Sequence, residues 1–137
     1  IGPLPTFYQR LKEGKKCFCS EAVRDFLDIG DFLRLMDLAL GENAPHGIFN
    51  VSTGLGFSIY EVFCAVCEYL GIDTPEVPRL PIGDDDVSEV VLNPAETEKA
   101  FNWKATVNFK DTIQNQLKWY DQFGINDIYS HLAEPNS

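Results

Sequence analysis

The segment 24–31, with the sequence RDFLDIGD, places an arginine at the head of an apolar run that ends in acidic residues. The apolar residues favour a short buried strand. Asp31 is expected to cap the helix that follows, because its carboxylate can accept from the free N–H groups of a first turn. An arginine fixed at such a place offers a planar fork of donors to a phosphate or a carboxylate. Arg24 is therefore a candidate anion-binding residue, the alternative being that it pairs with Asp25 or Asp28.

The cysteines form a second pattern that could carry chemistry. A CxC and a CxxC can hold zinc, and they stand at Cys17, Cys19, Cys64 and Cys67. Against zinc, the second pair lies inside a helical pattern of apolar residues with no turn to spread the thiolates, and the first pair flanks Phe18 on an expected strand. Free cysteine packs as a small hydrophobe. We therefore expect buried thiols in a reducing cytosol and no metal.

Composition limits the kinds of partner. A chain of 137 residues with 45% hydrophobic and 23% charged residues can bury one core and is typical of a folded globular protein. Its net charge of −10 argues against nucleic acid, whose phosphates are neutralised by lysine and arginine, and against anionic membrane surfaces. No apolar stretch approaches the ~20 residues that cross a bilayer. A small anionic ligand could still meet the basic residues of the first quarter, which are Arg10, Lys12, Lys15, Lys16 and Arg24.

Helix and strand signals alternate along the chain, which predicts an α/β fold. Helices are expected over 5–13, 31–41, 58–70, 94–101 and 109–123, and strands over 16–19, 24–29, 47–51 and 88–92. Ser58 and Glu61 form a capping box, and Gly41 and Gly71 are expected to end helices in the left-handed conformation. The 47–51 segment is apolar on both sides, as in a strand buried in a parallel sheet, yet the chain offers few strands to pair with it.

Five motifs follow one another in a characteristic order: Gly2-Pro3 before the first helix, Arg24-Asp25-Phe26, Gly47-Ile48-Phe49-Asn50, Asn102-Trp103-Lys104 and Trp119-Tyr120. This order resembles the C-terminal half of the extended short-chain dehydrogenase/reductases that act on nucleotide sugars, the family of UDP-galactose 4-epimerase and dTDP-glucose 4,6-dehydratase. The resemblance covers roughly residues 2–123. It implies that residues 1–137 form one helix-rich, mixed α/β substrate-binding lobe with short strands, which lacks most of the Rossmann sheet of its parent. In the family, 47–51 is the last strand of that sheet.

The resemblance implies five substrate-binding residues. Arg24 matches the arginine that contacts the diphosphate of the nucleotide sugar. Phe18 matches an aromatic residue beside the base, and Lys16 a residue whose backbone contacts the base. Asn50 matches a polar ligand contact of the dehydratases. Arg79 lies one or two positions before the family's second phosphate-binding arginine and can replace it only if the loop bends differently.

Each of these assignments has an alternative or a departure beside it. Phe18 could be a plain core ring, and the Asn50 side chain could bond its own turn. Between Phe18 and Arg24, relatives carry a Gly-Asp/Asn-Gly turn where this chain has CSEAV, so the base contacts are expected to shift. The aspartates 84–86 would repel phosphate and are expected to face water.

The family's catalytic and cofactor residues are not expected in this chain. Tyr8 and Lys12 match Tyr-x-x-x-Lys and lie one helical turn apart, but no sheet or cofactor loop precedes them. Gly54-Leu55-Gly56 lacks the third glycine and the acidic residue of a dinucleotide fingerprint. The resemblance places NAD or NADP in the parent protein, bound by an N-terminal half that is absent here.

The leading hypothesis is the nucleotide-sugar-binding part of an NAD(P)-dependent epimerase, dehydratase or reductase of carbohydrate biosynthesis. Such a parent is expected to be cytoplasmic and homodimeric. The alternative is a free-standing interaction or sugar-nucleotide-binding module without catalysis. Since the apolar face of the 31–41 helix and the 47–51 strand need a cover, the chain alone is expected to self-associate.

Overall fold

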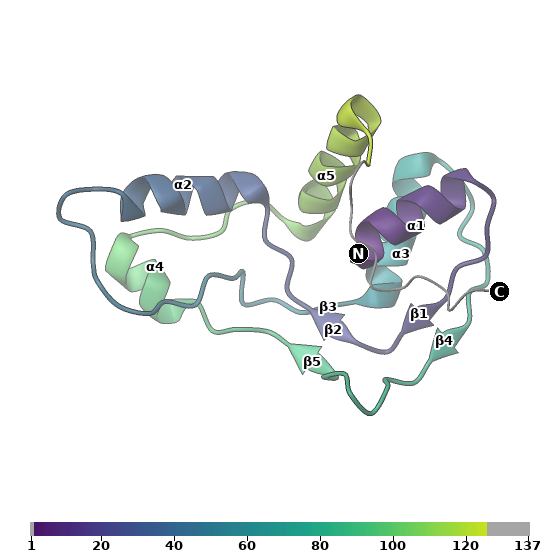
Figure 1. The fold of residues 1–137 in the computed structure, drawn as a ribbon, viewed down its shortest axis with the longest axis horizontal. Helices are drawn as coiled ribbons and strands as arrows, with labels where there is room; N and C mark the ends of the chain where they lie inside the picture. The colour runs from purple at the N-terminus through teal and green to yellow at the C-terminus, as the bar shows by residue number, and fades with distance from the viewer. Residues whose placement is uncertain (1, 126–137) are drawn as a thin grey trace.

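The computed structural model of the chain describes residues 2–125 (Figure 1). The helices are α1 (Pro3–Lys12), α2 (Ile29–Ala39), α3 (Ile59–Leu70), α4 (Ala95–Phe101) and α5 (Phe109–Phe123). The strands, each of two residues, are β1 (Cys19–Ser20), β2 (Val23–Arg24), β3 (Phe57–Ser58), β4 (Arg79–Leu80) and β5 (Glu89–Val90). This mixed α/β architecture with short strands confirms the predicted fold class. Within the described range, no helix is long and apolar enough to span a membrane.

The strands form two small sheets. β1 pairs in parallel with β4, while β2 lies between the antiparallel β3 and the parallel β5. The segment 79–90 therefore runs beside 19–24. The Glu21 amide donates to the Leu80 carbonyl at 3.1 Å, and the Val23 amide donates to the Ser88 carbonyl at 2.8 Å. These pairings place Arg24 at the centre of the three-stranded sheet.

Helix α3 is the centre of the core. Its inner face, with Val62, Phe63 and Val66, is fully buried between α1 and α5. Phe7 of α1 meets Phe63 edge to face, with ring centroids 5.3 Å apart, and Leu117 of α5 completes the contact. Figure 1 shows these three helices gathered at one end of the molecule, with α2 and α4 paired at the other.

The boundaries of α3 follow the predicted local signals. The Glu61 amide donates to the Ser58 hydroxyl at 3.1 Å, and the Ser58 amide donates to the Glu61 carboxylate at 2.7 Å, which completes the capping box. Gly71 ends the helix with φ 68°. Helix α5 also has its predicted bounds. Gly41, by contrast, was expected to end α2 in the same conformation, and this is wrong, because Leu40 in a right-handed conformation is the C-cap.

The predicted cap of α2 is also wrong. Asp28, and not Asp31, is the N-cap, and its carboxylate accepts from the Gly30 amide at 2.8 Å. The helix therefore begins two residues earlier than expected, and the preceding strand is limited to β2. Asp31 lies in the first turn and its side chain points inward, where its carboxylate accepts hydrogen bonds from Thr106 and Val107.

The expected strand at 47–51 makes no strand pairing within residues 2–125. Its backbone is held by side chains instead, since the Thr97 hydroxyl donates to the Asn50 carbonyl. Phe49 packs edge to face on Phe101, with ring centroids 5.1 Å apart. A strand needs a neighbour to complete its hydrogen bonds, and the described part of the chain places none beside this segment.

Candidate functional site

Arg24 is held on both sides by the sheet and presents its guanidinium at the surface. Its side chain is 27% exposed. Nη1 donates to the Val23 carbonyl at 2.8 Å, and Nη2 donates to Asp86 Oδ1 at 2.8 Å. Neither Asp25 nor Asp28, the two partners considered from sequence, is bonded to it. A guanidinium carries five N–H donors, so these two bonds leave donors for an anion.

The aspartates 84–86 are all exposed, as expected, and Asp86 in addition contacts Arg24. Asp86 is the last residue of a turn in which its amide donates to the Gly83 carbonyl at 3.0 Å. Its Oδ1 accepts from the Val87 amide as well as from Arg24, each at 2.8 Å. The carboxylate therefore lies where an anionic ligand of Arg24 would lie.

Phe18 and Lys16 occupy the segment that leads into β1. The Phe18 ring is 55% exposed, which contradicts the core alternative and leaves the ring free to stack. The Lys16 carbonyl accepts from Arg10 Nε at 2.7 Å. Because a carbonyl oxygen has a second lone pair, this bond fixes the backbone without excluding a further donor. Their predicted contacts with a base stay predictions.

Arg79 makes a different contact from Arg24. It stands opposite Cys19 in the β1–β4 pair, and opposite residues project to the same face of a sheet. Cys19 is buried on the side covered by α3, and the Arg79 guanidinium accordingly lies over the ring of Tyr60, 3.8 Å from its centroid. The Tyr60 contact was not predicted from the sequence, and a shared phosphate site for both arginines stays a prediction.

Asn50 is exposed on the extended segment between α2 and β3. No side-chain bond to its own turn is present among the described residues, and none joins it to Arg24. The structure thus brings Lys16, Phe18 and Arg24 together on one short stretch of chain. Arg79 is paired with this stretch at Cys19, with its guanidinium over Tyr60, whereas no hydrogen bond joins the Asn50 side chain to it among the described residues.

The Gly54-Leu55-Gly56 turn is used for packing. The Asp25 carboxylate accepts from the Thr53 amide at 3.0 Å, the Thr53 hydroxyl at 2.6 Å and the Gly54 amide at 2.7 Å. At Gly56 a Cβ would lie 2.7 Å from the Val23 side chain, so the glycine permits a close approach to β2. The amide that a pyrophosphate would need is bonded inside the protein.

Tyr8 and Lys12 also have a structural role. The buried Tyr8 hydroxyl donates to Asp121 of α5, and Lys12 Nζ donates to the Tyr8 oxygen at 3.1 Å. Tyr69 of α3 donates to the same carboxylate. Burial, together with the bond to Asp121, raises the pKa of Tyr8. A tyrosine that acts as a base needs the opposite shift, and the cluster instead ties α1, α3 and α5 together.

The four cysteines have free thiols, and Cys19 and Cys67 are fully buried. Burial raises the pKa of Cys19 to about 11, which makes it a poor nucleophile and a poor metal ligand. In the part of the chain that the structure describes, no group of three or more His, Cys, Asp or Glu side chains could hold a metal ion.

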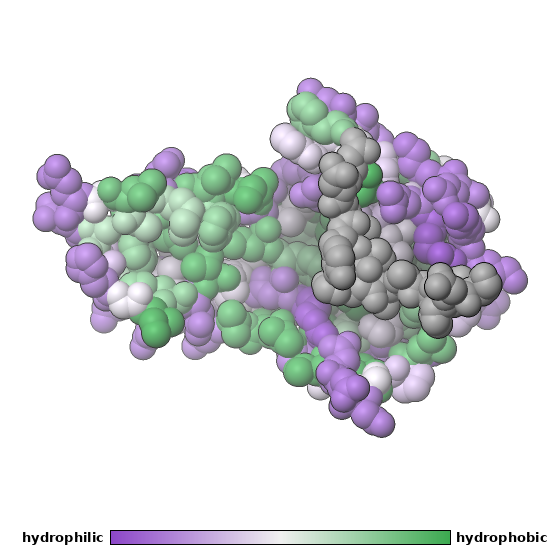
Figure 2. All heavy atoms as spheres, in the orientation of Figure 1, coloured by the Kyte–Doolittle hydropathy of each residue, from purple (hydrophilic) through white to green (hydrophobic). Residues whose placement is uncertain are grey.

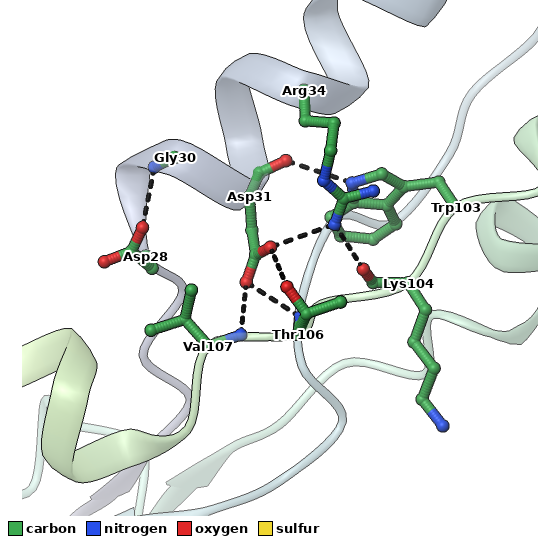
Figure 3. A network of polar contacts seen from close by, with 8 residues as sticks. All are labelled: Asp28, Gly30, Asp31, Arg34, Trp103, Lys104, Thr106 and Val107. Atoms are coloured by element: carbon green, nitrogen blue, oxygen red, sulfur yellow. Dashed lines mark hydrogen bonds and ion pairs between the residues drawn. The ribbon is translucent and has the colours of Figure 1, made fainter.

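Asp31 forms a network that the sequence did not reveal (Figure 3). Its carboxylate, 3% exposed, accepts from the Thr106 amide, the Thr106 hydroxyl and the Val107 amide, each at 3.0 Å, and from Arg34 at 2.9 Å. Trp103 Nε1 donates to the Asp31 carbonyl at 3.0 Å. Burial alone would raise the pKa of Asp31, but the bonds from Val107, Arg34 and Thr106 hold it below its usual range. The helix that follows the Arg24 strand is thereby fixed to the segment before α5.

A cavity of about 510 Å³ lies between the 53–57 loop and the 104–110 segment, with Phe26, Phe57 and Phe109 in its lining. None of the five predicted site residues lines this cavity. Arg24, Phe18 and Lys16 are instead on open surface, so a ligand there would be only partly enclosed by residues 2–125.

Comparison with solved structures and curated proteins finds several relatives of this chain, although no protein-family profile matches it. The enzyme WbmG of Bordetella bronchiseptica, in complex with NAD and UDP, is 60% identical with a TM-score of 0.88, over 98% of this chain and 44% of WbmG. WbmH of the same organism, in complex with NAD⁺, is 33% identical with a TM-score of 0.83, over 91% of this chain and 42% of WbmH. UDP-arabinose 4-epimerase 1 of Arabidopsis thaliana is 32% identical over 100 residues, which are 71% of this chain and 24% of that protein. The chain therefore spans about a quarter of the length of this curated relative and less than half of the length of these two solved structures.

Proposed function

Because this chain belongs to the extended short-chain dehydrogenase/reductase family of NAD-dependent nucleotide-sugar epimerases and dehydratases, we propose that it is the nucleotide-sugar-binding part of such an enzyme. The ligand that we infer is a UDP-sugar. The UDP in the WbmG complex and the 4-epimerases among the relatives support this choice of base. NAD would be bound by a further part of the same protein, in keeping with the NAD in WbmG and WbmH.

The observation that carries the proposal is the placement of Arg24. Hydrogen bonds on both sides of β2 fix its backbone, and the bond from Nη1 to the Val23 carbonyl fixes its guanidinium. A prearranged planar fork of donors suits the oxygens of a diphosphate. The exposed Phe18 ring, six residues earlier on the same stretch, is available to stack on a base.

The exposed apolar residues near α2 support a further, NAD-binding part in the same protein. Leu33 of α2 is 55% exposed, Leu40 is 85% exposed, and Ile48 of the unpaired 47–51 segment is 98% exposed. Figure 2 shows hydrophobic side chains gathered over α2. Apolar residues exposed together mark a contact surface. We assign this surface to the NAD-binding part, since WbmG has more than twice the length that this chain matches.

The test is Arg24→Ala in the full-length protein, with UDP binding measured by calorimetry. A charge-assisted contact contributes about 1.5–3 kcal/mol, so UDP affinity should fall roughly tenfold to a hundredfold. Arg24→Lys should recover little, because an ammonium cannot reproduce the fork. Lys99→Ala, which removes one positive charge from exposed α4, is the matched control and should bind UDP normally. Unchanged UDP affinity in Arg24→Ala would contradict the proposed contact.

NAD binding separates the proposal from its alternative. The full-length protein should bind NAD in the same calorimeter. A protein that binds UDP tightly but shows no NAD binding would be a free-standing sugar-nucleotide-binding module, and the enzyme assignment would be wrong.

A further inference from the structure

The loop between β4 and β5 projects from the molecule, and both of its ends are hydrogen-bonded to the segment 19–24. The Leu80 carbonyl is bonded by the Glu21 amide, and the Ser88 carbonyl is bonded by the Val23 amide. The residues between them, 81–87, form an outward loop, which Figure 1 shows between β4 and β5. Because both ends are tied to the stretch that leads to Arg24, the loop is held beside that arginine.

The loop carries three consecutive aspartates, of which one faces Arg24. The turn closed by the Asp86 amide and the Gly83 carbonyl, at 3.0 Å, directs Asp86 toward β2. Asp86 Oδ1 accepts from Arg24 Nη2 at 2.8 Å. Neither Asp84 nor Asp85 forms an ion pair with any residue that the structure describes. Asp85 is therefore a matched control, since it carries the same charge and is also exposed on the same loop, without the contact.

We propose that Asp86 is an internal competitor for Arg24: its carboxylate occupies a position on the guanidinium that a ligand phosphate takes, and a nucleoside diphosphate displaces it. The inference rests on the proposed function. A phosphate oxygen and the Asp86 carboxylate on the same guanidinium edge would repel each other at contact distance. The Asp86 side chain is 53% exposed, and exposed ion pairs are weak, so the displacement is easy.

The competition affects only ligands that contact Arg24. In the free protein the cation is satisfied internally, so a neutral nucleoside gains nothing from it. A diphosphate brings more negative charge than one carboxylate and replaces Asp86 with a net gain. Asp86 thus lowers the affinity for ligands that bind through Arg24 and leaves a neutral nucleoside unaffected, so it sets how strongly the site prefers a diphosphate.

The experiment compares Asp86→Asn with Asp85→Asn in the full-length protein, and titrates each variant with UDP and with uridine. Loss of an exposed ion pair corresponds to a change of about twofold to fivefold. Asp86→Asn should bind UDP more tightly than Asp85→Asn by this factor, with no difference for uridine. Asp86→Ala should act in the same direction. In an Arg24→Ala background the advantage of Asp86→Asn should disappear.

Two results would overturn the competitor role. Equal UDP affinities of Asp86→Asn and Asp85→Asn would show that the ion pair has no bearing on binding. Weaker binding of both UDP and uridine to Asp86→Asn would show that Asp86 contacts the nucleoside itself. Failure of the proposed function looks different, because Arg24→Ala would then bind UDP as well as the unaltered protein does.

Discussion

Replacing Asp31 by asparagine should destabilise the protein strongly, although the change removes one charge and alters the shape of the side chain little. In the structure this carboxylate accepts four hydrogen bonds, from the Thr106 amide and hydroxyl, the Val107 amide and Arg34. An asparagine has one acceptor oxygen and turns an NH₂ group toward the remaining donors. The variant would therefore leave buried N–H groups without a partner.

The size of the effect follows from burial and from the number of bonds. Asp31 is 3% exposed, so water cannot replace the lost acceptor. Hydrogen bonds to charged groups contribute about 1.5–3 kcal/mol each, but bonds to one carboxylate are not additive. Breaking a buried charged network typically costs about 3–5 kcal/mol. We therefore expect the free energy of unfolding to fall by about 3 kcal/mol.

Urea denaturation of the full-length protein, followed by tryptophan fluorescence and circular dichroism, would measure this change. Asp37→Asn is the control, since Asp37 lies on an exposed position of the same helix and makes the same change in charge. It should alter stability by less than about 0.5 kcal/mol. If Asp31→Asn were as stable as Asp37→Asn, the network of Figure 3 would not stabilise the fold.

The pH dependence of the free energy of unfolding gives a second test of the role of Asp31. The pKa of Asp31 is lowered in the folded protein, so its carboxylate stabilises the fold above the unfolded pKa of about 3.9. This contribution is lost as the pH falls through the folded pKa. The stability difference between the unaltered protein and Asp31→Asn should therefore be largest near neutral pH and shrink in acid.

Two further variants and measurements test other parts of the structure. Gly56→Ala should destabilise by about 1–3 kcal/mol, because its Cβ would lie 2.7 Å from Val23 and 2.9 Å from Val91. Gly83→Ala, where a Cβ meets nothing within 4 Å, should leave the urea midpoint almost unchanged, and equal effects of the two would be inconsistent with close packing at Gly56. Thiol titration after unfolding should count four free thiols, and metal analysis should find less than one zinc per chain. Stoichiometric zinc would show that the cysteines bind metal after all.

Features coded by neighbouring residues could be predicted from the sequence. The capping box of α3 depends on Ser58 and Glu61 alone, and Gly71 supplies the left-handed C-cap four residues after Cys67, the last buried residue of the helix. Helix α5 likewise begins at the Asn108 cap, whose side chain accepts from the Asp111 amide at 2.8 Å. Local hydrogen bonds and periodicity decide such boundaries, so a pattern can identify them.

Features that depend on distant residues could not be predicted. The choice between Asp28 and Asp31 as a cap was decided by Thr106, 75 residues away, which draws Asp31 into the core. The partner of Arg24 is 62 residues away on a loop whose path no spacing reveals. The 47–51 segment has strand composition, but a strand also needs a neighbour, and none lies beside it among residues 2–125.

A crystal structure of the full-length protein with UDP tests the central claim most directly. The structure predicts a diphosphate oxygen within about 3 Å of an Arg24 guanidinium nitrogen, with the Asp86 carboxylate moved away from it. A complex in which UDP is bound, the diphosphate lies elsewhere and Arg24 remains paired with Asp86 would contradict the assignment of this chain's nucleotide site.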